Sequence, residues 1–197
     1  TEMLPGLVSW WSGNSNTFDA VGPNNIATFT TAAYTTGKVG AAFSLNGLTS
    51  RIAINDSASL NFSSNANFSV EMWIKTGMSN ASGGGIIYPN VPLFEKRTTA
   101  VTGWVGYSLS MNQGRLAFAM GTPGTVAPGA VSNYISSGPE LRDLMFHHVA
   151  VTVNRSATNG GTLYVDGLPV LTFNPKPLNV SLVNTSPLYI GAPTITT

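Results

Sequence analysis

Few side chains in this sequence could carry out acid–base or nucleophilic chemistry. The chain of 197 residues contains no cysteine, two histidines and eight carboxylates. Hydrolysis of a glycosidic bond needs two carboxylates that flank the bond. The carboxylates are Glu2, Asp19, Asp56, Glu71, Glu95, Glu140, Asp143 and Asp166. No set of them alternates along one stretch, which is the pattern that would place them together on one face of a strand. The sequence therefore argues against catalysis.

Glu71 lies in the stretch Phe68–Lys75, whose alternating apolar residues predict a strand. It shares a face of that strand with Trp73 and Lys75. A lone glutamate beside a lysine is typical of a structural ion pair. We therefore predict that Glu71 is a structural carboxylate, not a general acid.

The two histidines, His147 and His148, are adjacent, so a strand would point them to opposite faces. Zinc ligation from a strand favours alternate positions, and the sequence offers no third histidine and no cysteine. We predict structural roles for both.

A calcium site is the better candidate for metal chemistry. Calcium takes six to eight oxygen ligands, which can be carboxylates, amides, backbone carbonyls or water. The stretch 13–25 supplies Asp19 together with several asparagines, among them Asn24. Two interpretations of Asp19 stay open: it is a calcium ligand, or it is an Asx-turn residue that organises its own loop.

Exposed aromatic rings could stack on sugars, with nearby polar groups bonding the hydroxyls. Trp104, Tyr88 and Tyr134 lie in stretches that we predict to be long loops (97–105, 77–92 and 121–138). They are our candidate ligand-binding residues. The alternative for Trp104 is that it folds back over one end of the fold.

Trp10 and Trp11 are adjacent and face opposite ways, so they cannot form one platform: one should be buried, and the other covered or exposed.

Strand patterns dominate the rest of the chain. Alternating or β-branched runs occur at 107–111, 115–120, 148–154 and 162–171, with hairpin turns at Asn112–Gly114 and Asp166-Gly167. Glycine and proline recur about every ten residues, and no useful stretch has the 3.6-residue period of a helix. We predict an all-β, antiparallel, two-sheet jelly-roll sandwich that forms a single domain over residues 1–197.

The composition excludes several classes of function. Hydrophobic residues make up 43% of the chain and charged residues 9%, with a formal net charge of +1. This balance argues against disorder, and without a basic cluster it argues against nucleic-acid binding. No apolar run is long enough to cross a membrane, and no signal peptide is recognisable at the start, although a cleaved one is compatible with the sequence.

The motifs resemble those of bacterial laminin G-like jelly rolls of the concanavalin A-like superfamily. The similarity begins with Gly6-Leu-Val-Ser-Trp-Trp and Asp19, and continues through Gly37–Gly47 and Phe68–Lys75. It resumes at Phe146–Ala150, at Leu163–Gly167 and at Pro187–Gly191, so that it covers nearly the whole chain in order.

This resemblance implies a concave sheet and a non-catalytic role in binding glycans or proteins outside the cell. It places Trp73 in the core and a structural calcium at Asp19, with Asn24 and Asn46 as weaker candidate ligands. Related glucanases carry Glu-x-Asp-x-Glu on one strand, and this chain has no such triplet.

Three features depart from the family. Asn46 replaces an aspartate, which would weaken calcium binding, and Phe146 replaces a tryptophan. The family's usual last strand, with its acidic motif, is not found after Gly191, which implies a trimmed domain or an exposed edge open to self-association.

Together these features predict a bacterial, secreted or cell-surface recognition module of a larger protein, with carbohydrate as its most plausible ligand. The alternative is a structural or adhesive module that binds protein. A glycan-cleaving enzyme is the least favoured class.

Overall fold

A computed structural model describes residues 5–47, 49–77, 81–83, 86–88, 90–98, 104–121 and 131–191; for 81–83, 86–88, 90, 131 and 132 it describes the backbone alone. Within these ranges the chain is almost entirely β-structure, as predicted. Its first strands are β1 (Ile26–Thr30), β2 (Ala33–Thr36), β3 (Ala41–Ser44), β4 (Arg51–Ile54) and β5 (Phe68–Ile74). The middle strands are β6 (Ala81–Gly83), β7 (Ile86–Tyr88), β8 (Asn90–Arg97), β9 (Gly106–Asn112), β10 (Arg115–Gly121) and β11 (Val131–Ile135). The last are β12 (His147–Val153), β13 (Gly161–Val165), β14 (Leu168–Phe173) and β15 (Leu188–Ile190), and two short 3-10 helices are η1 (Ala58–Leu60) and η2 (Lys176–Leu178).

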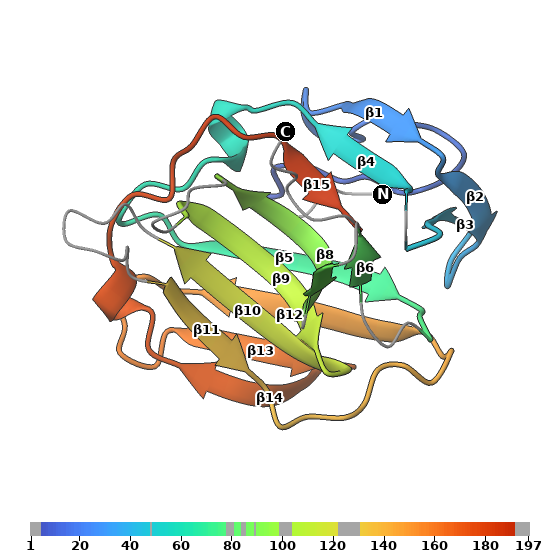
Figure 1. Cartoon of the computed structure of the whole chain (residues 1–197). Coiled ribbons are helices and arrows are strands. Elements are labelled where there is room, and N and C mark those ends of the chain that lie inside the picture. The colour runs from blue at the N-terminus through green and yellow to red at the C-terminus, as the bar shows by residue number, and fades with distance from the viewer. Residues whose placement is uncertain are drawn as a thin grey trace.

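Two antiparallel sheets pack face to face (Figure 1). The larger sheet has seven strands in the order β1-β4-β15-β8-β9-β10-β11, and the smaller has four in the order β14-β13-β12-β5. Two further hairpins, β2–β3 and β6–β7, stand beside them. This is the predicted antiparallel sandwich, and it confirms the predicted fold class.

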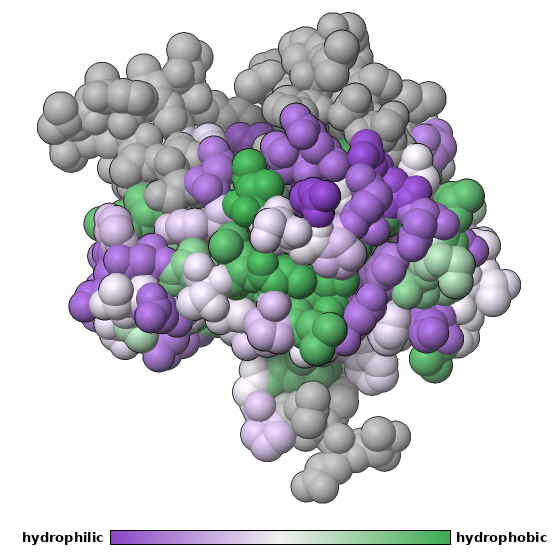
Figure 2. Space-filling view, turned by 90° about the horizontal axis from the view of Figure 1, so that it is seen from below, coloured by the Kyte–Doolittle hydropathy of each residue, from purple (hydrophilic) through white to green (hydrophobic). Residues whose placement is uncertain are grey.

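The core lies between the inner faces of the two sheets. Each strand places alternate side chains there, because successive side chains point to opposite faces. The fully or almost fully buried residues include Ile52, Ile54, Tyr107, Leu109, Met111, Leu116, Phe118, Val149, Val151 and Leu163. Figure 2 looks on the molecule from below, where β11 and β14 form the lower sheet edges, and shows apolar residues running through a mostly polar surface.

Both predicted hairpin turns are present. Asp166 and Gly167 have φ angles of 51° and 80°, and Gln113 and Gly114 have φ angles of 48° and 83°. Two successive residues with positive φ make the tight turn whose twist matches that of the flanking strands. These turns join β13 to β14 and β9 to β10.

Two of the predicted long loops were wrong in part. The stretch 77–92 contains β6, β7 and the start of β8, and the stretch 121–138 contains β11. Proline and glycine interrupt the alternation of apolar residues in these stretches. Pro92, for example, stands inside β8, at an irregularity of the ladder with β9. A proline is tolerated at such a bulge.

The structure also corrects the position of Trp73. Its side chain is 48% exposed on the outer face of the four-stranded sheet, not in the core. Successive side chains of a strand point to opposite faces. Because Met72 and Ile74 on either side of Trp73 face inward and pack against the core, Trp73 faces outward. The Trp73 ring contacts the His148 ring edge-on at 5.3 Å, and the Lys38 ammonium lies 5.2 Å from its centroid.

The expected pairing of Glu71 with Lys75 is wrong as well. Residues four apart in a strand are separated by about 13 Å. The Glu71 carboxylate instead lies 3.7 Å from His148 Nε2, and the Lys75 ammonium lies 5.3 Å from the Phe146 ring centroid.

The expectation for the two adjacent tryptophans is confirmed. Trp11 packs against the core, with its ring 6.3 Å from that of Phe94, and its indole N–H donates to the Asn24 carbonyl at 2.7 Å. Trp10 is 51% exposed.

Candidate functional site

The outer face of the seven-stranded sheet carries one continuous row of side chains. The strand registers place residues of six neighbouring strands side by side: Ala53, Tyr189, Glu95, Ser108, Ala119 and Asn133. Most of these side chains are small. Glu95 is the only carboxylate in the seven strands of this sheet.

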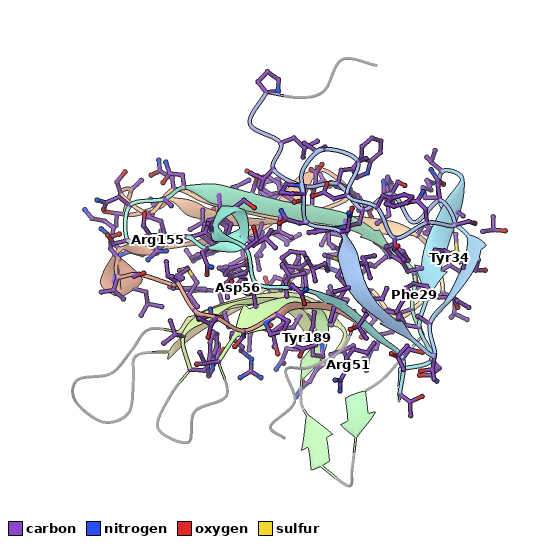
Figure 3. The ribbon with its side chains drawn as sticks, turned by 90° about the horizontal axis from the view of Figure 1, so that it is seen from above. Phe29, Tyr34, Arg51, Asp56, Arg155 and Tyr189 are labelled. Atoms are coloured by element: carbon purple, nitrogen blue, oxygen red, sulfur yellow. The ribbon has the colours of Figure 1, made fainter. Side chains whose placement is uncertain are left out.

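This row forms the floor of a recess. Its residues face away from the core, yet Glu95 is 3% exposed, Ser108 is 6% and Ala119 is 8%. A cavity of about 180 Å³ adjoins the row and is lined by Ser110, Asn112, Ala117, Phe118, Ala119, Asn133 and Ile135. The hairpin β6–β7 projects from the same side of the molecule (Figure 3). Ala119 and Asn133 belong both to this row and to the lining of the cavity, and Glu95 lies two strands away from Ala119 along the row.

Glu95 is held in a charged cluster. Its carboxylate is 2.9 Å from Nε of Arg97 and accepts a hydrogen bond from the Ser108 hydroxyl at 3.1 Å. Arg97 is its neighbour on the same face of β8, two residues along the strand. Together they form a fixed ion pair on the outer face of β8.

Trp104 supports this cluster from one side. The guanidinium carbon of Arg97 lies 5.1 Å from the centroid of the Trp104 ring, within the range of a cation–π contact. The indole also lies against Gly121, where an added Cβ would come within 2.6 Å of its Cε3 atom. Trp104 is thus half-buried, and the alternative interpretation, that it folds back over the sandwich, describes its packing.

Tyr189 lies on the other side of Glu95, as its direct neighbour across β15 and β8. The guanidinium carbon of Arg51 is 5.6 Å from the Tyr189 ring centroid. Figure 3 shows both side chains on the outer side of the larger sheet. An arginine–aromatic pair therefore stands on each side of the carboxylate.

Tyr134 and Tyr88 do not join this site as predicted. Tyr134 belongs to β11, not to a loop, and its ring stacks on Phe173 with centroids 3.9 Å apart. Its hydroxyl donates to the Asn174 carbonyl at 3.1 Å, so the side chain ties the edges of the two sheets together. Tyr88 lies in β7, and its side chain is outside the described residues.

Asp19 organises the loop that contains it. Its Oδ1 atom accepts hydrogen bonds from the backbone N–H of Trp10 at 2.9 Å and of Val21 at 3.0 Å, and its Oδ2 atom accepts one from the N–H of Asn24 at 3.2 Å. Burial alone would raise the pKa of Asp19, but the N–H groups of Trp10, Gly22 and Val21 hold it below its usual value. Three backbone N–H groups therefore donate to this carboxylate, as the loop-organising interpretation of Asp19 predicts.

The other two candidate calcium ligands are engaged elsewhere. The Asn24 amide donates to the hydroxyls of Ser9 and Ser59 at 2.7 and 2.9 Å. Asn46 closes its own turn by accepting from the N–H of Ser50 at 2.9 Å. That turn adjoins the far end of β1 from Asn24, about 13 Å of strand away. The structure therefore does not bring Asn46 to Asp19, and calcium binding stays a prediction.

His147 is held between two carboxylates. Its Nδ1 atom is 2.7 Å from Asp166 Oδ2, and its Nε2 atom is 3.2 Å from both oxygens of Asp143. The hydrogen bond to Asp166, opposed by burial and aided by Asp143, raises the pKa of His147 above its usual value. Among the residues that the structure describes, no group of three or more His, Cys, Asp or Glu side chains could hold a metal ion.

Sequence reasoning missed Glu95, Arg97 and Tyr189. The signal available was weak: Glu95 and Arg97 stand two residues apart, which places them on one face of a strand. It was hidden because Lys96, which shares the inner face with Phe94, is itself charged and fully buried.

Comparisons with known proteins agree with this architecture. The family model described as the concanavalin A-like lectin/glucanases superfamily, of the laminin G type, matches residues 45–194. A search of curated proteins finds no match. In the described part of the chain, no helix is long and apolar enough to cross a membrane.

Three solved structures are similar in fold. The binding domain of Paraclostridial Mosquitocidal Protein 1 is 20% identical, with a TM-score of 0.65 over 85% of this chain and 39% of that one. The receptor-binding domain of botulinum neurotoxin D is 14% identical, with a TM-score of 0.61 over 88% and 41%. The binding domain of botulinum neurotoxin serotype G is 13% identical, with a TM-score of 0.54 over 87% and 42%. This chain therefore spans about two fifths of the length of each.

The family model covers well over half of the sequence, and the two packed antiparallel sheets are the architecture that the motifs predicted. The chain belongs to the laminin G-like family of the concanavalin A-like lectin/glucanase superfamily.

Proposed function

We propose that this chain is a recognition module that binds carbohydrate in the recess of the seven-stranded sheet and does not cleave it. The observation that carries the proposal is the Glu95–Arg97 pair, buried at the floor of the recess and backed by Trp104. Binding domains among the similar structures support recognition as the class of function.

The chemistry of the recess suits a sugar. A carboxylate oxygen accepts hydrogen bonds from hydroxyls, and a guanidinium donates to them, so neighbouring hydroxyls can bridge Glu95 and Arg97. Ser108 and Ala119, opposite each other on β9 and β10, are small, and Ala119 lines the cavity in which we place the sugar ring. Trp104 and Tyr189 supply apolar walls, which a sugar-binding site uses to cover the C–H faces of the ligand.

Binding without cleavage follows from the set of carboxylates. Glycoside hydrolysis uses two of them, as acid and as nucleophile or base. Glu95 stands alone in the strands of this sheet and is paired with Arg97. Purified protein incubated with a bound polysaccharide should release no reducing ends, and release would overturn this part of the proposal.

A glycan array followed by titration calorimetry tests the binding itself. We expect a defined set of glycans to bind, and Glu95→Gln to weaken that binding at least tenfold while circular dichroism and thermal unfolding show a folded protein. The matched control is Glu140→Gln, an exposed carboxylate paired with Arg142 outside the strands. A wild-type chain that binds no glycan, or a Glu95→Gln variant that binds as the wild type does, would overturn the proposal.

We also propose that the module acts outside the cell or at its surface. The support is its membership of a laminin G-like family and a polar surface with few charges. Fractionation of the source cells, followed by immunodetection of the protein, tests this: protein confined to the cytoplasmic fraction would contradict it.

The second candidate function is a structural or adhesive module that binds protein. One observation favours it, namely that β5 forms an edge of the smaller sheet with exposed residues along it.

A further inference from the structure

Positive charge gathers on the outer face of the seven-stranded sheet. Its strands carry Arg51, Glu95, Lys96, Arg97 and Arg115, of which Lys96 alone faces the core. The outer face therefore holds three cations and one carboxylate, whereas the whole chain holds nine cations and eight carboxylates. The masked part of this balance is small, because Glu2 is the one charged residue outside the described ranges.

Arg51 lies on this face without a carboxylate beside it. The register with β1 sets it next to Thr30, and its guanidinium carbon lies over the Tyr189 ring. Glu95, one strand beyond Tyr189, is already engaged by Arg97 and by the Ser108 hydroxyl. Among the carboxylates of the described residues, none forms an ion pair with Arg51.

Arg115, near the opposite edge of the same face, is held differently. Its Nη1 group donates to the carbonyls of Ser137 and Gly138. A carboxylate is also near, because Glu140 lies against Gly114, the residue before Arg115, and pairs with Arg142. Arg51 is therefore the better candidate to bind a group from outside the chain.

The contact with Tyr189 leaves the hydrogen-bond donors of Arg51 available. The five N–H groups of a guanidinium lie in its plane, so a ring stacked on that plane does not occupy them. Within the described ranges, no hydrogen bond from the Arg51 side chain is formed. A guanidinium presented in this way suits an oxyanion such as a carboxylate, which it binds through two parallel N–H bonds.

We propose that the glycan bound in the recess is an acidic oligosaccharide whose carboxylate or sulfate group binds Arg51 beside Tyr189. The inference rests on the proposed carbohydrate binding. Ser110, which lines the cavity, lies on β9, three strands from β4, so about 14 Å of sheet separates it from Arg51. A single sugar ring is too short to contact both. The anionic group therefore belongs to a different sugar unit from the ring in the cavity.

Paired probes on a glycan array test the class of ligand. They are uronic-acid oligosaccharides beside their carboxyl-reduced forms, and sulfated oligosaccharides beside their desulfated forms. We expect the acidic member of a pair to bind at least about tenfold more tightly than the neutral one, because a charged pair of hydrogen bonds is lost with the anionic group. The two kinds of probe distinguish a carboxylate from a sulfate.

Titration calorimetry with the acidic glycan that binds most tightly tests the residue. Arg51→Gln should weaken binding by roughly ten- to a hundredfold, to the affinity of the wild type for the neutral counterpart. The matched control is Lys176→Gln, which removes the same charge at an exposed lysine of η2 and should bind as the wild type does. Circular dichroism checks that both variants are folded.

The outcomes separate this inference from the proposed function. Equal binding of acidic and neutral glycans, or wild-type affinity in Arg51→Gln, overturns the inference, while the effect of Glu95→Gln still tests binding in the recess. An equal loss in Lys176→Gln also overturns it, because net charge and not Arg51 would then explain the effect. A chain that binds no glycan overturns both.

Discussion

The ammonium of Lys96 lies 2.8 Å from the Asp56 carboxylate, and the lysine side chain is fully buried between the sheets. The same ammonium donates to the Asn184 carbonyl at 2.8 Å and to the Asn61 amide oxygen at 3.1 Å. These bonds tie the end of β8 to the segments on either side of η1 and to the segment before β15. Because Glu95 and Arg97 flank Lys96 on the opposite face of β8, this buried cation fixes the strand that carries the proposed site.

Removal of one partner from this pair should be costly. Asp56→Asn leaves the Lys96 ammonium buried without its counter-ion, whereas Lys96→Met removes the buried charge and leaves Asp56, a third exposed, to water. We expect Asp56→Asn to lower the free energy of unfolding by about 1–3 kcal/mol, less than for a fully buried pair, because carbonyl and amide oxygens still contact the ammonium.

Thermal unfolding measures this, at about 2–4 °C per kcal/mol for a domain of this size. Lys96→Met should cost less than Asp56→Asn. Equal melting temperatures for Asp56→Asn and the wild type would mean that the pair contributes no stability.

Asp19 should stabilise its loop whether or not calcium is present. Asp19→Asn keeps the size of the side chain but removes the charge that accepts N–H bonds from Trp10, Val21 and Asn24. Charge-assisted hydrogen bonds contribute about 1.5–3 kcal/mol, so the melting temperature of the variant should fall in EDTA.

The same melts test the calcium prediction. If calcium binds at Asp19, millimolar calcium raises the melting temperature of the wild type and leaves that of Asp19→Asn unchanged. A wild-type melting temperature that is the same in calcium and in EDTA would contradict calcium binding. An Asp19→Asn variant as stable as the wild type in EDTA would contradict the loop-organising role.

The His147 cluster predicts a pH-dependent stability. The bond to Asp166 raises the pKa of His147, so the stabilisation is fully present below the usual value of 6.5 and is lost as the pH rises through the raised pKa. The hydrogen bond from His147, opposed by burial and aided by the His148 N–H and the two histidine charges, lowers the pKa of Asp166. The N–H of Met145 is the main cause of the lowered pKa of Asp143, and His147 adds to it. Both carboxylates therefore stay ionised well into the acid range.

Thermal unfolding of the wild type and of His147→Gln from pH 5 to pH 9 checks this. The wild type should exceed the variant most at pH 5 to 6, and the two curves should converge toward pH 9. Asp166→Asn should flatten the wild-type profile in the same way. A constant difference between wild type and His147→Gln across the range would show that the imidazole acts by packing and not by charge.

Much of the fold could be predicted because alternation and turn chemistry are local. The turns at Asp166-Gly167 and at Gln113-Gly114 are set by residues that tolerate positive φ, and the strands on either side follow. Strands interrupted by proline or flanked by glycine, such as β8 and β11, were missed because their apolar pattern is broken.

The site was harder to predict because it depends on which face of a strand each side chain occupies and on neighbours that are distant in sequence. Trp73 has the size of a core residue, yet it is exposed because its side chain points to the opposite face of β5 from those of its neighbours Met72 and Ile74. Glu95, Ser108 and Tyr189 meet only when three strands align, and this register cannot be read from any one of them. Two interpretations of Trp104 were open, a ligand-binding ring or a ring folded back over the sandwich, and its contacts with Arg97 and Gly121 appear only in the folded chain.

The central claim is that ligand binds in the recess of the seven-stranded sheet, and calorimetric titration of two tryptophan variants tests it most directly. Trp104 supports Arg97 at the recess, whereas Trp10 is 51% exposed on the segment before β1. With a glycan that the wild type binds, Trp104→Ala should reduce affinity at least tenfold and Trp10→Ala should leave it unchanged. Loss of binding in Trp10→Ala with full affinity in Trp104→Ala would contradict the account.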